Sequence, residues 1–178
     1  GVRFRLPASM NQVEYFGRGP AENYLDRNAG SMIGLYKSTA EELYFPYVRP
    51  QENGHHTDTR WVSLSTGKKG LLIQADNTIG FNALRNSIED FDDEEATGLP
   101  RQWSNFTPEQ VANHDEAAAK SVLRRQHHIN DITPRDFVEV CVDLKQQGVA
   151  GYDSWGSRPE PAYTLPANRE YNWGFTLI

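Results

Sequence analysis

The sequence lacks several features, and each absence argues against a class of protein. Cys141 is the only cysteine among 178 residues, so no internal disulfide can form. A single cysteine fits a reducing cellular compartment or a fold that needs no disulfide, and the sequence does not identify the compartment. No apolar run approaches the roughly 20 residues of a membrane-spanning helix, so we expect no membrane segment. Basic residues number 18 against 24 acidic ones, and the net charge of -6 argues against binding nucleic acid, which needs a basic face.

Signatures of catalysis and of metal binding are also missing. There is no Gly-x-Ser-x-Gly elbow and no glycine loop that could cradle a phosphate. Adjacent histidines at 55–56 and 127–128 would face opposite sides of a strand, so neither pair predicts a metal site. The acidic run at 90–95 lacks the spacing of a calcium loop and is expected to be solvated. Carboxylates are plentiful, but none is marked as buried, so no glycosidase pair can be assigned.

What the sequence does contain predicts an all-β protein. Aromatic residues make up 11% of the chain, and short alternating segments are separated by Gly, Asn and Pro turns. The expected strands are residues 2–6, 13–16, 57–64, 70–75, 79–84, 137–144 and 171–178. Residues 17–36 are expected to form a structured loop, and Pro46 and Pro50 to keep residues 43–48 out of a central sheet. The pattern predicts an antiparallel β-sandwich in one domain, residues 1–178.

One segment interrupts this pattern. Thr107 can cap a helix, Pro108 suits its first position and Gln110 completes a capping box. Residues 117–125 are rich in helix formers. We therefore expect a helical insertion around residues 107–125.

The short stretch 151–156, Gly-Tyr-Asp-Ser-Trp-Gly, is the clearest candidate for a functional site. It follows the strongest strand pattern and places Trp155 between two glycines. Glycines permit a tight turn, and an indole offers a flat apolar face with one N–H donor, which suits a sugar ring. The alternative is that Trp155 packs under the loop as ordinary core.

Four motifs, in order, resemble the C-terminal domain of β-galactosidases of glycoside hydrolase family two. They are Gly-Arg-Gly-Pro-Ala-Glu-Asn-Tyr-Leu-Asp-Arg at 17–27, Tyr-Val-Arg-Pro-Gln-Glu-Asn-Gly at 47–54, Thr-Arg-Trp at 59–61 and Asp-Ser-Trp-Gly at 153–156. The resemblance covers nearly all of the chain. It departs from the family pattern at residues 87–128, where the simplest account is an insertion of unknown role.

The resemblance implies an antiparallel β-supersandwich similar to galactose mutarotase, of which this chain looks like the latter part. In that family a Glu nucleophile, a Glu acid/base and a magnesium ion lie in a (β/α)8 barrel that this sequence lacks. No catalytic residue, metal ligand or cofactor is therefore expected here, and magnesium is expected only in the barrel. The implied partners are a galactoside or other sugar, the rest of the polypeptide and further copies in a homo-oligomer.

By resemblance, Trp155 is the platform that supports the sugar on the leaving-group side. Asp153 and Ser154 match the flanking residues, and side-chain to backbone hydrogen bonds from them would shape the turn. Two alternatives remain beside this one. The chain could be a stand-alone carbohydrate-binding module or mutarotase-like domain, or a scaffold in which Trp155 is core.

Overall fold

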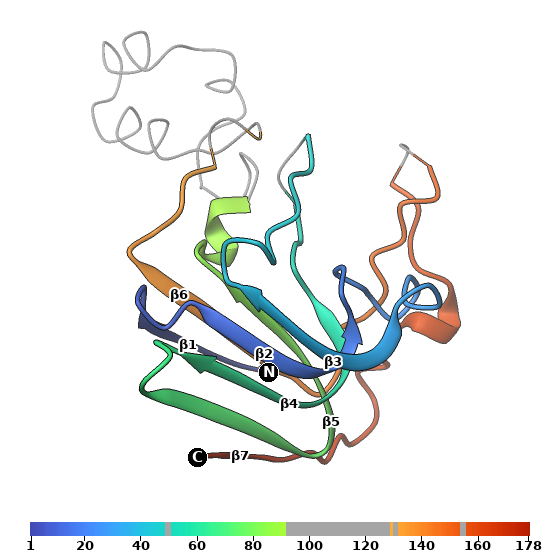
Figure 1. Cartoon of the computed structure of the whole chain (residues 1–178). Helices are drawn as coiled ribbons and strands as arrows, with labels where there is room; N and C mark the ends of the chain where they lie inside the picture. Colours follow the sequence, from blue (N-terminus) through green and yellow to red (C-terminus); the bar gives the residue numbers. More distant parts are fainter. Residues whose placement is uncertain (49–50, 92–128, 130–131, 154–155) are drawn as a thin grey trace, which may run out of the picture. The chain divides into compact units, whose positions relative to one another are not determined.

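The computed structural model describes residues 1–48, 51–91, 129, 132–153 and 156–178 (Figure 1). The chain divides into two compact units. The first comprises Gly1–Phe45, Asn53–Arg85 and Arg135–Ile178, and the second comprises Pro46–Glu52 and Asn86–Pro134. The prediction of one domain over 1–178 stays a prediction.

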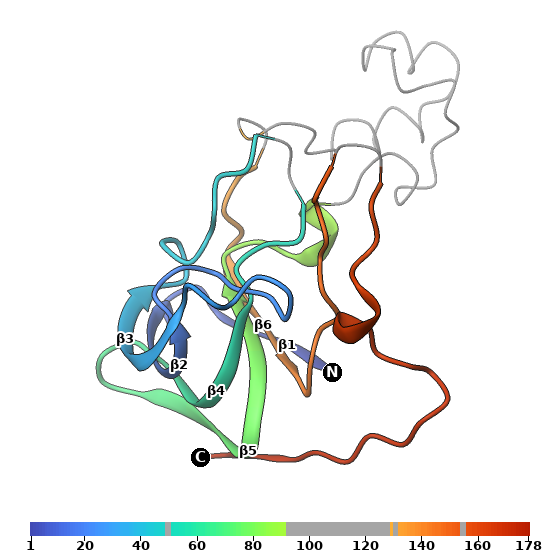
Figure 2. The same ribbon diagram turned by 90° about the vertical axis from the view of Figure 1, so that its right-hand side faces the viewer.

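The first unit is built on one antiparallel sheet of seven strands. The strands are β1 (Val2–Pro7), β2 (Gln12–Gly19), β3 (Met32–Thr39), β4 (His56–Ser65), β5 (Gly70–Leu84), β6 (Phe137–Asp143) and β7 (Phe175–Leu177). Their order is β1-β6-β5-β4-β2-β3, and β7 pairs with β5 (Figures 1 and 2). The predicted all-β antiparallel class is confirmed. No described helix is long and apolar enough to cross a membrane.

One face of this sheet forms the core. Alternate residues of β2, β4, β5 and β6 are 0–2% exposed: Val13, Tyr15, Val62, Leu64, Ile73, Phe81, Val138, Val140 and Val142. The strand expected at residues 137–144 is confirmed as β6, and its alternating valines face the core. Burying a large apolar side chain contributes about 1.5–3 kcal/mol, so the packing of this face stabilises the sheet.

The prediction that regular structure stops at residue 17 and gives way to a loop as far as residue 36 is wrong. β2 continues to Gly19, and β3 begins at Met32. Gly17 lies on the core face of β2, where an added Cβ would lie 2.5 Å from the hydroxyl oxygen of Thr59. Gly17 therefore serves close packing inside a strand, whereas the sequence pattern indicated a turn.

β4 contains a bulge that the alternation did not predict. Its register with β5 shifts between His56 and Trp61, and Asp58 has a φ of 52°. Thr59 and Val62 are therefore both buried, although regular alternation would place an odd-numbered and an even-numbered residue on opposite faces of the strand. The regular alternation expected of a strand over residues 57–64 is therefore broken at this bulge.

Two further strand predictions need correction. β5 is one strand of 15 residues, without the expected break at 76–78. It stays continuous because it changes partners: residues 73–75 pair with β7, and residues 80–84 pair with β6. The last strand is only Phe175–Leu177, shorter than the expected 171–178. Residues 43–48 contain no strand, as the prolines predicted.

In the second unit the structure describes one short turn, η1 (Ile88–Phe91). Asp90 is only 4% exposed, and its carboxylate accepts the N–H of Ser87 at 2.9 Å. The expectation of a solvated acidic run is therefore wrong for Asp90, because its carboxylate closes this turn. The remaining acidic residues 92–95, the expected helix at 107–125 and the histidines at 127–128 lie outside the described residues.

Candidate functional site

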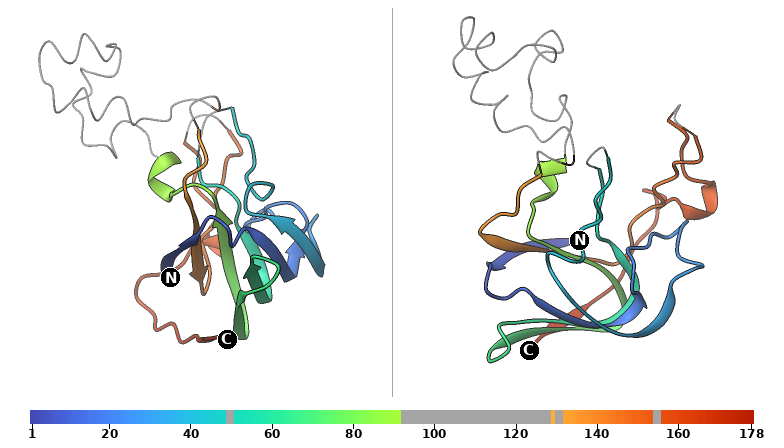
Figure 3. Two further views of the ribbon diagram at one scale, coloured as in Figure 1. Left: turned by 60° about the vertical axis from the view of Figure 1, so that its left-hand side comes forward. Right: turned by 45° about the horizontal axis from the view of Figure 1, so that its top comes forward.

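The loop singled out by the sequence leaves the sheet after β6. In Figures 1 and 3 its two arms run side by side away from the strands, and the returning arm leads into η4 (Pro161–Tyr163). Gly151 and Gly156 have φ values of 88° and 84°, a conformation that favours glycine. Tyr152 is 60% exposed, and Asp153 is also exposed. Ser154 and Trp155 lie outside the described residues, so their expected roles stay predictions.

Asp26 fixes the base of this loop. Its two carboxylate oxygens accept the N–H groups of Val149 at 3.1 Å and Ala150 at 2.8 Å. The neighbouring Gly148 donates its N–H to the carbonyl of Tyr163 at 2.8 Å. An added Cβ on Gly148 would lie 2.5 Å from Asp26, so only glycine allows this approach. A residue of the first motif thus holds the segment that leads to the last motif.

The segment that carries Asp26 is itself closed by short-range contacts. Tyr24 and Arg27 exchange backbone hydrogen bonds, at 2.8 and 3.3 Å. The guanidinium of Arg27 lies 5.0 Å from the centroid of the Tyr24 ring and donates to the carboxylate of Glu22 at 3.0 Å. These contacts hold the backbone around Asp26 in a tight turn.

Asn23 joins this turn to β4. Its side chain is fully buried, and its amide nitrogen donates to the carbonyls of Arg18 and Ala21 at 3.1 Å each. Its amide oxygen accepts the N–H of Thr57 at 3.0 Å and the hydroxyl of Thr57 at 2.6 Å. All the polar atoms of this buried side chain therefore have partners, as a buried amide requires.

Glu22 links the first motif to the second. Its carboxylate accepts the N–H of Gly54 at 2.7 Å and the hydroxyl of Tyr24 at 3.1 Å, and its side chain is 5% exposed. Next to Gly54, the buried Asn53 bonds through its side chain to both the N–H and the carbonyl of Phe45. Glu22 and Asn53 thus serve as structural ties.

His55 and His56 are buried beside these ties. The Nδ1 atom of His55 lies 2.7 Å from the amide oxygen of Asn82, and its ring stacks on Tyr24. In His56, Nδ1 lies 3.0 Å from the Gly54 carbonyl oxygen and Nε2 lies 3.3 Å from that of Pro20. Burial lowers the pKa of each histidine to about 4, so both rings are neutral near pH 7. Within the described residues, no group of three or more His, Cys, Asp or Glu could hold a metal ion.

The structure reveals one further buried carboxylate that the sequence did not mark. Glu139 on β6 is 3% exposed and pairs with the guanidinium groups of Arg5 at 2.9 Å and Arg3 at 3.6 Å. Arg5 also lies 4.1 Å above the ring of Phe137. The register of β1 with β6 produces this arrangement, because Arg5 pairs directly with Glu139. The pairing gives Glu139 a structural role between two strands.

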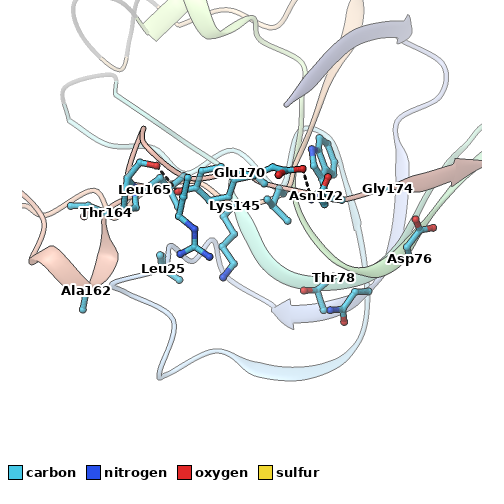
Figure 4. Close-up of a pocket in the computed structure, with 16 residues that line it drawn as sticks. Leu25, Asp76, Thr78, Lys145, Ala162, Thr164, Leu165, Glu170, Asn172 and Gly174 are labelled. Atoms are coloured by element: carbon cyan, nitrogen blue, oxygen red, sulfur yellow. Dashed lines mark hydrogen bonds between the residues drawn. The ribbon is translucent and has the colours of Figure 1, made fainter.

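A groove of about 770 Å³ lies at the foot of the loop. Leu144 and Lys145 line it where the chain leaves β6, Ala162 where the chain returns, and Leu25 beside the Asp26 anchor. Its remaining wall comes from residues 76–78 of β5 and from residues 164–166 and 169–174. Figure 4 shows Leu25 and Ala162 at one end of the groove and Asp76 and Gly174 at the other. The sequence pattern did not predict this groove, because it joins segments far apart in the chain.

Comparisons with known proteins agree with the four motifs. Residues 1–177 match a family model described as "Beta galactosidase small chain". The chain is 34% identical to a protein named beta-galactosidase from Priestia megaterium, over 99% of this chain and 14% of that protein. It is 28% identical to a beta-galactosidase of Vibrio cholerae over the same shares, and 40% identical to that of Arthrobacter sp. over 51% of this chain and 10% of that protein. The chain spans about 14% of the length of the first two relatives.

Proposed function

The chain belongs to the β-galactosidase small-chain family, and from this premise we propose that it forms the C-terminal part of a retaining β-galactosidase. The whole enzyme hydrolyses terminal β-galactosides such as lactose. This chain contributes a sugar platform and structural support, while the catalytic carboxylates lie in another part of the polypeptide. The match over residues 1–177 carries this proposal.

The proposed platform is Trp155, which receives the sugar on the leaving-group side. Two observations on the described part of the loop support this role. Gly151 and Gly156 both have positive φ values, a conformation typical of turns, and neighbouring Tyr152 is exposed. The anchor at Asp26 fixes the base of the loop, so a residue at the tip is carried on a defined support. Asp153 and Ser154 would shape the turn beside it.

The buried carboxylates described above form structural contacts, which agrees with the proposal that the catalytic carboxylates lie in another part of the polypeptide. Glu22, Asp90 and Glu139 each accept hydrogen bonds or ion pairs that hold elements together. A glycosidase instead needs two carboxyl groups that face the glycosidic bond, about 5–5.5 Å apart in a retaining enzyme. The proposed enzyme takes that pair, and its magnesium ion, from the barrel.

Hydrolysis by the 178-residue chain tests where the chemistry lies. We expect the purified chain to give no turnover of lactose or of a chromogenic galactoside. Turnover that is lost on replacing one of the chain's own Asp or Glu residues would overturn the proposed division. Turnover that survives every such replacement would indicate a contaminating enzyme and would be removed by further purification.

The alternative is a stand-alone carbohydrate-binding module or a mutarotase-like domain that works without a barrel. Titration of the isolated chain with galactose, glucose and lactose separates the two functions. Micromolar binding would favour the module. Weak or undetectable binding at the Trp155 loop would favour a part of a larger site, because half of the contacts would be missing.

A further inference from the structure

The groove at the foot of the loop has the size and the walls of a ligand site. Its volume of about 770 Å³ falls within the range of roughly 300–1,000 Å³ that is usual for small-molecule pockets. β5 supplies one wall, and the irregular segment between η4 and β7 supplies another (Figure 4). None of these residues belongs to the stretch 151–156.

The end of this irregular segment, next to β7, is held in place by the sheet. Asp76 donates its N–H to the carbonyl of Gly174 at 3.1 Å, and Phe175 pairs with Ala75 in the adjoining register. Gly174 lies so close to the carboxylate of Asp76 that an added Cβ would collide with it. The backbone beside Trp173 is therefore fixed against β5.

Trp173 supplies the aromatic surface of the groove. The side chain is half-buried and lines the groove, and its ring packs on Phe175 with centroids 5.5 Å apart. This contact limits the orientations of the indole. An indole fixed in this way offers a flat apolar face to the C–H groups of a ring and one N–H donor.

The charged groups of the groove balance. Lys145 and Arg169 are cationic, and Asp76 and Glu170 are anionic. Within the described residues, Asp76 and Lys145 form no side-chain hydrogen bond or ion pair, whereas Glu170 accepts the amide of Asn172 at 3.0 Å. A net charge near zero disfavours a strongly charged ligand. A set of donors and acceptors beside an aromatic face fits hydroxyl groups, each of which both donates and accepts.

We propose that this groove is a second saccharide-binding site, which takes a neutral sugar against the face of Trp173. Asp76 accepts hydrogen bonds from the sugar hydroxyls, and Lys145 and Arg169 donate to them. The site goes beyond the role of the Trp155 loop and does not require it, because the two sites use different aromatic residues.

The test follows the indole N–H signals of the ¹⁵N-labelled 178-residue chain during titration with galactose, glucose and lactose. Trp173→Ala and Trp155→Ala variants identify the two signals by their loss. We expect a saturable shift of the Trp173 signal with a dissociation constant in the millimolar range, and no shift of Trp61, which does not line the groove. An unchanged Trp173 signal up to about 100 mM sugar, where even millimolar sites are filled, would overturn the proposal.

Matched substitutions separate a built site from a surface effect. Asp76→Ala removes one hydrogen-bond acceptor and should weaken the affinity for the sugar by about three- to tenfold. Asp136→Ala, which changes an exposed residue outside the groove, should leave the affinity unchanged. Arg169→Ala should likewise lower the affinity for the sugar, and its control Arg158→Ala, outside the groove, should not. Equal effects of a groove variant and its control would overturn the proposal.

Two other outcomes have separate meanings. A shift of the Trp155 signal alone would support the proposed function of the loop and overturn the groove site. A larger shift of Trp173 with inorganic phosphate than with any sugar, at matched ionic strength, would identify an anion site and overturn the saccharide assignment.

Discussion

The segment 18–27 and the loop 148–156 belong to the same family resemblance, but they are held in opposite ways. The side chains of Asn23 and Glu22 are buried and form hydrogen bonds to neighbouring segments, and Nδ1 of the buried His55 lies within hydrogen-bond distance of Asn82. At the loop, no described residue lies within 4 Å of a Cβ added to Gly151 or Gly156, and the hydrogen bonds lie at its base. The first region is a fixed support, whereas the second region projects from it.

This difference separates the motifs with a structural role from the motif that we propose to carry the sugar platform. Glu22, Asn23 and Asn53 belong to the family motifs, and in the structure they hold strands and turns together. Asp26 belongs to the same motif and reaches across to the loop. It is therefore the residue that connects the support to the candidate site.

Acid should weaken the buried support most. Burial lowers the pKa of His55 and His56 from 6.5 to about 4 in the folded chain. The unfolded chain therefore takes up protons first, and stability is complete above pH 6.5 and falls as the pH drops toward 4. The loss should be on the order of 3 kcal/mol for each histidine. Urea unfolding across this pH range measures it.

The histidine ring signals provide the control for acid, because carboxylates elsewhere also respond to pH. In the folded chain the NMR signals of His55 and His56 should stay constant until the pH nears 4. Titration of either ring near pH 6.5 would show that the cluster is open to solvent, and would remove the contrast between the two regions.

Asn23→Ala should be the most damaging single substitution in the support. It leaves the carbonyls of Arg18 and Ala21 and both donors of Thr57 without this partner, at a cost of about 3–4 kcal/mol in the free energy of unfolding. The matched change at the surface, Asn172→Ala, should cost less than about 0.5 kcal/mol. Similar urea midpoints for the two variants would contradict the assignment of Asn23 to the buried support.

Asp26→Ala should loosen the loop while it leaves the support folded. Loss of a charged acceptor at the Val149 and Ala150 amides should cost about 2 kcal/mol locally, which corresponds to a roughly thirtyfold faster hydrogen exchange at those amides. Asp136→Ala is the matched control. Unchanged exchange at residues 149–150, or equal acceleration around Asn23, would show that the two regions are not held separately.

The strands could be predicted from the sequence where apolar and polar residues alternate regularly. They could not be predicted where a residue packs against a strand that is distant in the sequence. The buried face of β6 followed from its alternating valines. Gly17 lies inside a strand because Thr59 packs against it, and the bulge at Asp58 changes which residues of β4 face the core. Both features depend on a partner strand that the local sequence does not specify.

The candidate site was likewise predictable only in part. Gly151 and Gly156 have the positive φ values that favour glycine, which agrees with their expected place in a turn, whereas the tip between them lies outside the described residues. The Asp26 anchor joins positions more than a hundred residues apart, and no periodic pattern reports such a contact. The groove beside Trp173 was missed for the same reason.

Acceptor binding in the whole enzyme tests the central claim most directly. We propose that glucose binds on the leaving-group side, and Trp155→Ala should therefore weaken inhibition by glucose by about 1–3 kcal/mol, the range measured for stacking on an aromatic ring in base recognition. Inhibition by galactose should stay nearly unchanged, and Trp155→Phe should retain much of the glucose affinity. An unchanged inhibition constant for glucose in Trp155→Ala, or an equal loss for both sugars, would contradict the proposal that Trp155 is the platform of the leaving-group side.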